Sequence, residues 1–184
     1  MTRVTALDNR LARGHDALMA ADRSEPGVDV LLVCSTGGHL LQLLALREVW
    51  QDEARLWVTF DKSDARALLR DERVVHAFGP TNRTFGVTAA LNTLRNLALA
   101  WRVVRRTRPA VVLTTGAGVA VPFAWVGRAL GARVVYVESF TRIEGPSLSC
   151  RLIAPVSARI YGQWPEFAEA VPRARYLGNV FSRG

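Results

Sequence analysis

The chain has 184 residues, of which 49% are hydrophobic, and it carries a formal net charge of +8. This length and composition predict one globular domain with a sizeable core and no low-complexity tract. Cys34 and Cys150 are the only cysteines, which excludes a zinc motif or a disulfide framework and favours a reducing compartment. The basic side chains, nearly all arginines, favour an anionic partner: nucleic acid, an acidic membrane or a phosphorylated substrate.

Residues 1–27 are predicted to form an N-terminal extension to a domain that spans residues 28–184. The extension has no apolar segment flanked by basic residues, so we expect neither a signal peptide nor a transmembrane helix there. Its last residues, 24–27, include proline and glycine and are typical of a break before a strand.

Residues 28–46 are predicted to form a strand, a glycine turn and a helix. The apolar run from Val28 to Cys34 suits a strand buried on both faces of a parallel sheet, and leucines at helical spacing follow. The turn between them contains Ser35, Gly37, Gly38 and His39. Backbone N–H groups at the start of a helix suit a phosphate, although an ordinary tight turn also explains the glycines. Neither the dinucleotide fingerprint nor a Walker loop is present.

His39 is the candidate for chemistry at this turn. The unperturbed pKa of an imidazole, about 6.5, lies near neutrality, so the side chain can bind an anion or accept a proton. A histidine that only caps the helix is the alternative.

Further strands are predicted over residues 54–60, 73–78, 109–114 and 133–137, with shorter ones over 158–161 and 175–177. Between them we expect a short helix that ends at Arg70, a long helix over 86–106, and a helix over 119–130 that Gly131 closes. This alternation predicts an α/β fold with a Rossmann-like, doubly wound, mostly parallel sheet. In such sheets, ligands bind at the carboxyl ends of the strands.

The helix over residues 86–106 is predicted to be amphipathic. Its apolar stripe includes Leu91, Leu94 and Trp101, and the arginines along one border of that stripe are Arg95, Arg102 and Arg106. Such a helix can lie in the interface of an anionic membrane, or it can pack its stripe on the sheet. Nucleic acid is not expected as a partner, because the chain has no zinc-finger spacing and no RNA-binding aromatic signature.

Polar residues follow two of the predicted central strands. Thr115, Gly116 and Gly118 form a second glycine turn, which could hold a diphosphate together with the first turn or could be an ordinary turn. Glu138, Ser139 and Arg142 follow the next strand. Glu138 could orient a hydroxyl or act as a base and Arg142 could bind phosphate, or the two could form a structural ion pair. No Asp-x-Asp pair is present, so no metal is expected, and no cofactor is expected because the dinucleotide fingerprint is missing.

Six motifs occur in a fixed order along the chain: Ser35-x-Gly-Gly-His39, Asn82-Arg83, Thr115-Gly116-x-Gly118, Glu138-Ser139-x-x-Arg142, Ser147-Leu148-Ser149 and Gln163-Trp164-Pro165-Glu166. In this set the chain resembles the acceptor-side, membrane-associated subunit of the split UDP-N-acetylglucosamine transferase of dolichol-linked oligosaccharide synthesis. It is more similar to that family's bacterial relatives, which serve capsule and exopolysaccharide synthesis. The resemblance covers roughly residues 28–181.

The resemblance implies the N-terminal half of a B-fold glycosyltransferase. A separate chain would supply most of the nucleotide-sugar site, forming a heterodimer, and this chain would bind a polyprenyl-pyrophosphate-linked acceptor at the cytoplasmic face of the membrane. Eukaryotic members begin with a membrane-spanning helix that we do not expect in this chain, so membrane contact would fall to residues 86–106. A non-catalytic membrane anchor that recruits a catalytic partner is the alternative function.

The resemblance also implies roles for individual residues. His39 and Glu138 would take part in catalysis. The residues expected to bind the acceptor or its phosphates are Ser35, Gly37, Gly38, Asn82, Arg83, Thr115, Gly116, Gly118, Ser139 and Arg142. One departure is Cys150, which stands where the family pattern has glycine.

Overall fold

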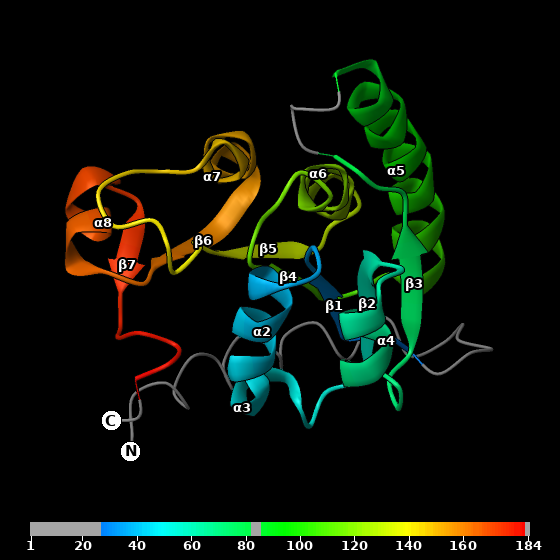
Figure 1. The fold of residues 1–184 in the computed structure, drawn as a ribbon, viewed down its shortest axis with the longest axis horizontal. Helices are drawn as coiled ribbons and strands as arrows, with labels where there is room; N and C mark the ends of the chain where they lie inside the picture. The colour runs from blue at the N-terminus through cyan, green and yellow to red at the C-terminus, as the bar shows by residue number, and fades with distance from the viewer. Residues whose placement is uncertain (1–26, 82–85, 183–184) are drawn as a thin grey trace.

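The computed structural model describes residues 27–81 and 86–182 of the chain. Their strands form one seven-stranded sheet in which every strand runs parallel to its neighbours, in the order β3-β2-β1-β4-β5-β6-β7 (Figure 1). The strands are β1 (Val30–Val33), β2 (Arg55–Phe60), β3 (Val74–Ala77), β4 (Val111–Thr114), β5 (Arg133–Val137), β6 (Ser157–Gly162) and β7 (Ala174–Tyr176). The predicted strands and the α/β fold are confirmed.

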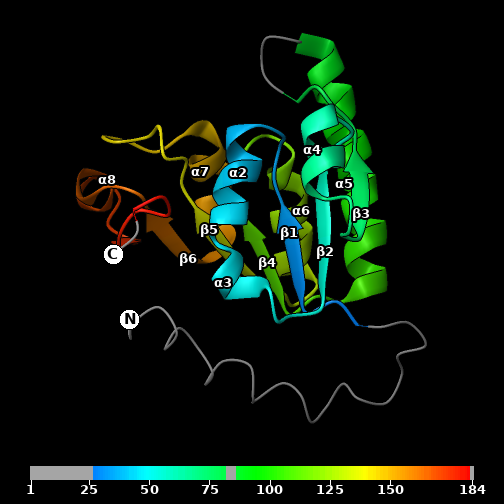
Figure 2. The same cartoon turned by 60° about the horizontal axis from the view of Figure 1, so that its bottom comes forward.

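Helices cover both faces of the sheet (Figure 1). One face carries α2 (Gly38–Ala45), α3 (Arg47–Trp50) and α4 (Ser63–Leu68). The other carries α5 (Gly86–Thr107), α6 (Ala120–Ala129), α7 (Leu148–Ile153) and α8 (Pro165–Ala170), with a 3-10 turn at Ala154–Val156. Among these, α5 is the longest and projects beyond the sheet (Figure 2).

The central strands are mostly apolar, as expected for strands that are covered on both faces. In β1, Leu31 and Val33 pack into the core under α5 and α6, whereas Leu32 packs into the core under α2 and α4. All four residues of β1 are buried. This is the arrangement that gives the strands of parallel sheets their continuous Val- and Leu-rich sequences.

The order of the strands reverses between β1 and β4. From β1 the chain winds outward through β2 to β3, then returns to the other side of β1 and continues to β7. The last residues of the two central strands, Val33 and Thr114, are paired in register. The loops that follow β1 and β4 therefore leave the sheet side by side, at the switch point where doubly wound folds bind ligands.

The long helix α5 buries a face different from its leucine stripe. Asn96 is fully buried and pairs with the backbone of Phe78 after β3: its Oδ1 accepts from the Phe78 N–H at 2.9 Å and its Nδ2 donates to the Phe78 carbonyl at 2.8 Å. One turn earlier, Asn92 Nδ2 donates to the carbonyl of Pro80 at 3.0 Å. Leu94, by contrast, is 63% exposed. The leucine stripe therefore does not pack on the sheet.

No helix within residues 27–81 and 86–182 combines the length and the apolarity needed to cross a membrane.

Candidate functional site

The first glycine turn opens onto free space at the start of α2. Gly37 has a φ of 75°, a conformation that glycine adopts without strain, and it precedes the first helical residue, Gly38. A Cβ added at either glycine would have no other atom within 4 Å. The N-cap residue of α2 is Gly37, which makes no side-chain hydrogen bond to the helix start, so no N-cap side chain competes with an anion for the first helical N–H groups.

A carboxylate already contacts this turn. The backbone N–H of Gly37 donates to Asp64 Oδ2 of α4 at 2.7 Å. The N–H that the sequence assigns to phosphate is therefore occupied by an anionic oxygen of the chain itself. A ligand phosphate at this position has to share or displace the carboxylate.

His39 is tied to the second glycine turn across the switch point. Its Nδ1 lies 2.8 Å from the carbonyl oxygen of Thr115, and the Thr115 hydroxyl donates to the carbonyl of His39 at 2.9 Å. A carbonyl only accepts, so Nδ1 carries the proton. Burial lowers the pKa of His39, and this effect exceeds the opposite ones of the Thr115 carbonyl and the Glu138 charge. The ring is therefore neutral at pH 7, and Nε2 carries the free lone pair.

The second glycine turn is tightly packed. Gly116 has a φ of 100°, and a Cβ there would lie 2.9 Å from the hydroxyl oxygen of Tyr136. A Cβ on Gly118 would lie 2.8 Å from the carbonyl oxygen of Thr81, in the connection between β3 and α5. Close packing alone therefore requires both glycines, unlike the open glycines of the first turn. Asn82 and Arg83, which follow Thr81, lie outside the described residues.

Glu138 is fully buried directly after β5. Its Oε1 accepts from the Tyr136 hydroxyl at 3.0 Å and the Ser139 N–H at 2.8 Å, and its Oε2 accepts from the Ser147 N–H at 2.9 Å. The carboxylate thus closes the loop of residues 139–147, and its side chain has no surface exposed to a ligand. Arg142, in the same loop, is exposed and does not form the ion pair with Glu138 that the sequence left open.

Gln42 is a site residue that the sequence analysis missed. Its Nε2 donates to the carbonyl of Glu138 at 2.7 Å, and its Oε1 accepts from the N–H of Phe140 at 3.0 Å. It is 2% exposed and joins α2 to the loop after β5. The only signal in the sequence is an amide among leucines, on the buried face between Leu40 and Leu43.

The remaining predicted residues lie on the same edge of the sheet. Ser35 is half-buried at the end of β1, and its hydroxyl contacts the carbonyl of Thr36 at 3.4 Å. The Ser139 hydroxyl lies 3.0 Å from that of Thr141. In the part of the chain that the structure describes, no three His, Cys, Asp or Glu side chains gather closely enough to hold a metal ion.

With this geometry in place, comparison with known proteins is informative. The model of a family described as "Oligosaccharide biosynthesis protein Alg14 like" matches residues 81–180. The chain belongs to the Alg14 family. A relative from Eremothecium gossypii, named UDP-N-acetylglucosamine transferase subunit ALG14, is 33% identical over 180 residues, covering 83% of this chain and 80% of the relative. The human protein of that name is 31% identical over 99 residues, covering 50% of this chain and 46% of the relative.

Solved structures show the same fold. Acinetobacter baumannii MurG matches with a TM-score of 0.64 and 20% identity, covering 86% of this Alg14-family chain and 47% of MurG. The UDP-GlcNAc 2-epimerase of Methanocaldococcus jannaschii matches with a TM-score of 0.60 and 12% identity, covering 82% and 45%. The chain thus spans about half the length of these structures. The matches confirm the expected Rossmann-like fold, and the family assignment agrees with the resemblance found in the six motifs.

Proposed function

We propose that this chain is the acceptor-side subunit of a two-chain glycosyltransferase. The complex would transfer a sugar from a nucleotide sugar to a polyprenyl-pyrophosphate-linked acceptor at the cytoplasmic face of the membrane. The family assignment supports this proposal, because its relatives are named as subunits of a UDP-N-acetylglucosamine transferase. The observation that carries it is the placement of His39, with a free Nε2, beside an open glycine turn at the switch point of the sheet.

In the proposed reaction, His39 Nε2 accepts the proton of the acceptor hydroxyl. The hydroxyl oxygen forms a bond to the anomeric carbon of the donor sugar while the bond from that carbon to the nucleotide diphosphate breaks. The free lone pair suits this role, because a general base must be unprotonated at the working pH. A phosphate would lie against the N–H groups at the start of α2, and Arg142 would be a cationic contact for the diphosphate of the lipid acceptor.

Glu138 would contribute indirectly, by fixing the position of the loop that follows β5. Its oxygens are engaged by Tyr136, Ser139 and Ser147, so it fixes the loop that presents Ser139 and Arg142. We assign it a positioning role in place of direct proton transfer. The second glycine turn would contribute chiefly through Thr115, which orients His39.

A second polypeptide would supply the donor side of the cleft. The relatives' names describe a subunit, and the chain spans about half the length of the MurG and epimerase structures that it matches. A nucleotide sugar would then lie at the shared cleft, between this chain and its partner.

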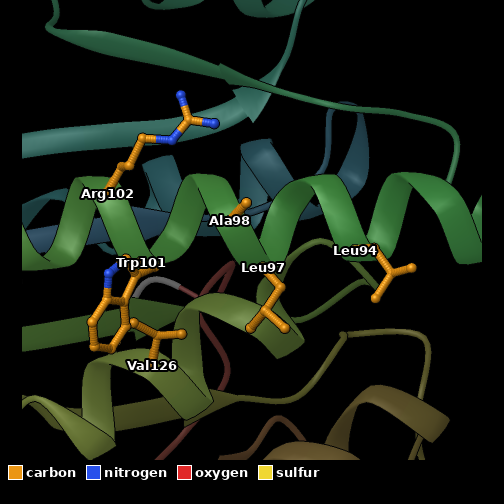
Figure 3. A pocket seen from close by; sticks show the side chains of 6 residues that line it. All are labelled: Leu94, Leu97, Ala98, Trp101, Arg102 and Val126. Atoms are coloured by element: carbon orange, nitrogen blue, oxygen red, sulfur yellow. The ribbon is translucent and has the colours of Figure 1, made fainter.

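Contact with an anionic membrane would fall to the exposed stripe of α5. A pocket of about 500 Å³ lies along this stripe, lined by Leu94, Leu97, Ala98, Trp101, Arg102 and Val126. Figure 3 shows Leu97 and Trp101 pointing toward Val126 of α6. Anionic lipid attracts each nearby basic residue by about 1 kcal/mol, so Arg95, Arg102 and Arg106 would add to the affinity.

Transfer measured in three reconstitutions tests the proposed function. The samples would contain this chain alone, a donor-binding partner alone, and both together, with a polyprenyl-pyrophosphoryl sugar in membranes. The proposal expects transfer only, or mainly, in the mixture. Equal transfer by the partner with and without this chain would contradict it.

A membrane anchor that recruits the catalytic partner is the second candidate function. The exposed leucine stripe supports it, because an anchor needs a membrane-binding surface and does not need a catalytic residue. The two functions differ at His39: an anchor tolerates its substitution, whereas an acceptor-side subunit does not.

A further inference from the structure

A polar pocket lies between the loop after β5 and the start of α7. It has a volume of about 390 Å³ and is lined by Thr141, Arg142, Ile143, Glu144, Gly145, Pro146 and Arg151. Arg142 comes from the loop, whereas Arg151 comes from α7. Two guanidinium groups from different elements thus line one pocket.

Partly buried hydrogen bonds hold the backbone around this pocket in place. The Ser147 N–H donates to Glu138 Oε2 at 2.9 Å, which anchors the end of the loop to β5. The Ser147 hydroxyl oxygen caps α7 by accepting from the Cys150 N–H at 3.0 Å, and the Arg151 N–H donates to the Ser147 carbonyl at 3.0 Å. Arg151 therefore starts from a backbone position that is fixed relative to the loop.

The charge in the pocket is not neutralised by the protein. Among the residues described, neither Arg142 nor Arg151 forms an ion pair, and both are exposed. Glu144 is the one acidic residue in the lining, against two arginines. The pocket therefore offers two planar cationic groups, whose donors match phosphate oxygens in pairs.

We propose that this pocket is a diphosphate-binding subsite in which Arg142 and Arg151 each bind one phosphoryl group. The subsite is distinct from the open glycine turn, but Gln42 joins α2 to the first residues of the same loop, so both belong to one edge of the sheet. The assignment rests on the proposed function in one respect, because the proposed function identifies the bound diphosphate as part of the lipid acceptor. A nucleotide diphosphate is the other source of the same chemistry.

Calorimetric titration of the full chain at low salt tests the subsite. The probes are inorganic pyrophosphate, farnesyl diphosphate as a short prenyl diphosphate, and UDP. We expect Arg151→Gln and Arg142→Gln each to weaken farnesyl diphosphate binding about tenfold, because each removes a charge-assisted hydrogen-bonding group. Arg151→Lys should recover part of the loss, since it restores the charge but not the planar donor pair.

Two further variants supply a control outside the pocket and a test of the charge inside it. Arg128→Gln removes an exposed arginine of α6 outside the pocket and should leave binding unchanged. Glu144→Gln removes the acidic group from the lining and should tighten binding a few-fold, since like charges repel. The thermal transition of each variant should match that of the unaltered chain, because the substituted side chains are exposed.

Three results would overturn parts of the proposal. Unaltered farnesyl diphosphate binding in both arginine variants, or no binding by the unaltered chain, would remove the subsite. UDP binding that depends on both arginines as strongly would overturn the assignment to the lipid acceptor. Diphosphate binding that depends on Arg151, without transfer by the two-chain complex, would contradict the proposed function and leave the subsite standing.

Discussion

His39 and Thr115 exchange two hydrogen bonds between the loops that follow β1 and β4. The imidazole Nδ1 donates to the Thr115 carbonyl at 2.8 Å, and the Thr115 hydroxyl donates to the His39 carbonyl at 2.9 Å. One bond fixes the tautomer of the ring, and the other fixes the backbone from which the ring projects. Together they leave Nε2 unprotonated at the switch point of the sheet.

Replacing Thr115 by valine tests one of these two hydrogen bonds without the other. Thr115→Val removes the hydroxyl donor but keeps the carbonyl that accepts from Nδ1, so the tautomer should persist. The His39 carbonyl loses one partner, which should cost about 1 kcal/mol of stability. We expect transfer by the complex to fall no more than about tenfold, since 1.4 kcal/mol corresponds to a factor of ten. Thermal unfolding and steady-state transfer rates measure the two effects, and a larger loss of transfer would mean that the hydroxyl itself contacts substrate.

The lowered pKa of His39 predicts how stability depends on pH. The unfolded chain protonates this ring near pH 6.5, whereas the folded chain does so only at lower pH. Below pH 6.5 the unfolded state therefore binds more protons, so the free energy of unfolding should fall as the pH falls. Urea unfolding between pH 5 and 8 measures it, with His39→Gln as the control that lacks this contribution. Identical pH dependence in both proteins would contradict the lowered pKa.

Asp64 is predicted to oppose anion binding at the first glycine turn. Its carboxylate accepts from the Gly37 N–H, so a phosphate there meets a like charge. Asp64→Asn removes that charge, and we expect inorganic pyrophosphate to bind about threefold more tightly at low salt, with a smaller gain at high salt. Asp71→Asn, in an exposed turn after α4, is the matched control. Unchanged affinity in Asp64→Asn would mean that the anion does not approach Gly37.

The exposed stripe of α5 is predicted to bind anionic liposomes. The double substitution Leu94→Gln and Trp101→Gln should weaken binding at least about tenfold, because partial burial of two large apolar side chains in lipid contributes more than 1.4 kcal/mol. Both side chains are about half exposed or more, so the fold should survive. Leu68→Gln on α4, which replaces a leucine that is 47% exposed and lies on another helix, is the control in the sedimentation assay. Equal loss in the control would contradict a specific role for α5.

The sheet could be predicted from sequence because its strands carry a local signal. Strands covered on both faces are continuous apolar runs, as in Val30–Val33, and the chain separates them by glycine turns and helices. The two loops at the switch point could be placed for the same reason, since they follow directly from the strands. His39 and Thr115 were both among the predicted site residues, but their mutual contact spans 76 positions and has no local signal.

The faces of α5 and the role of Glu138 depend on contacts distant in sequence. Asn96 is buried and pairs with the backbone of Phe78, so its face of α5 packs inward together with Ala100 and Val104, while Leu91 and Leu94 are exposed. Glu138 stands at a strand end, where a carboxylate suggests chemistry, but Ser147 folds back onto it and completes its burial. Neither contact can be predicted from the hydrophobic periodicity of the sequence or from the position of a residue along a strand.

The measurement that tests the central claim most directly is sugar transfer by the two-chain complex carrying His39→Asn. The substitution removes the Nε2 lone pair, while an amide can still donate toward the Thr115 carbonyl. Assembly with the partner and liposome binding should match those of the unaltered complex. The account predicts that transfer falls by roughly a hundredfold or more, as for the loss of a general base. Full transfer by the variant complex would contradict the account and leave this chain as a membrane anchor for its partner.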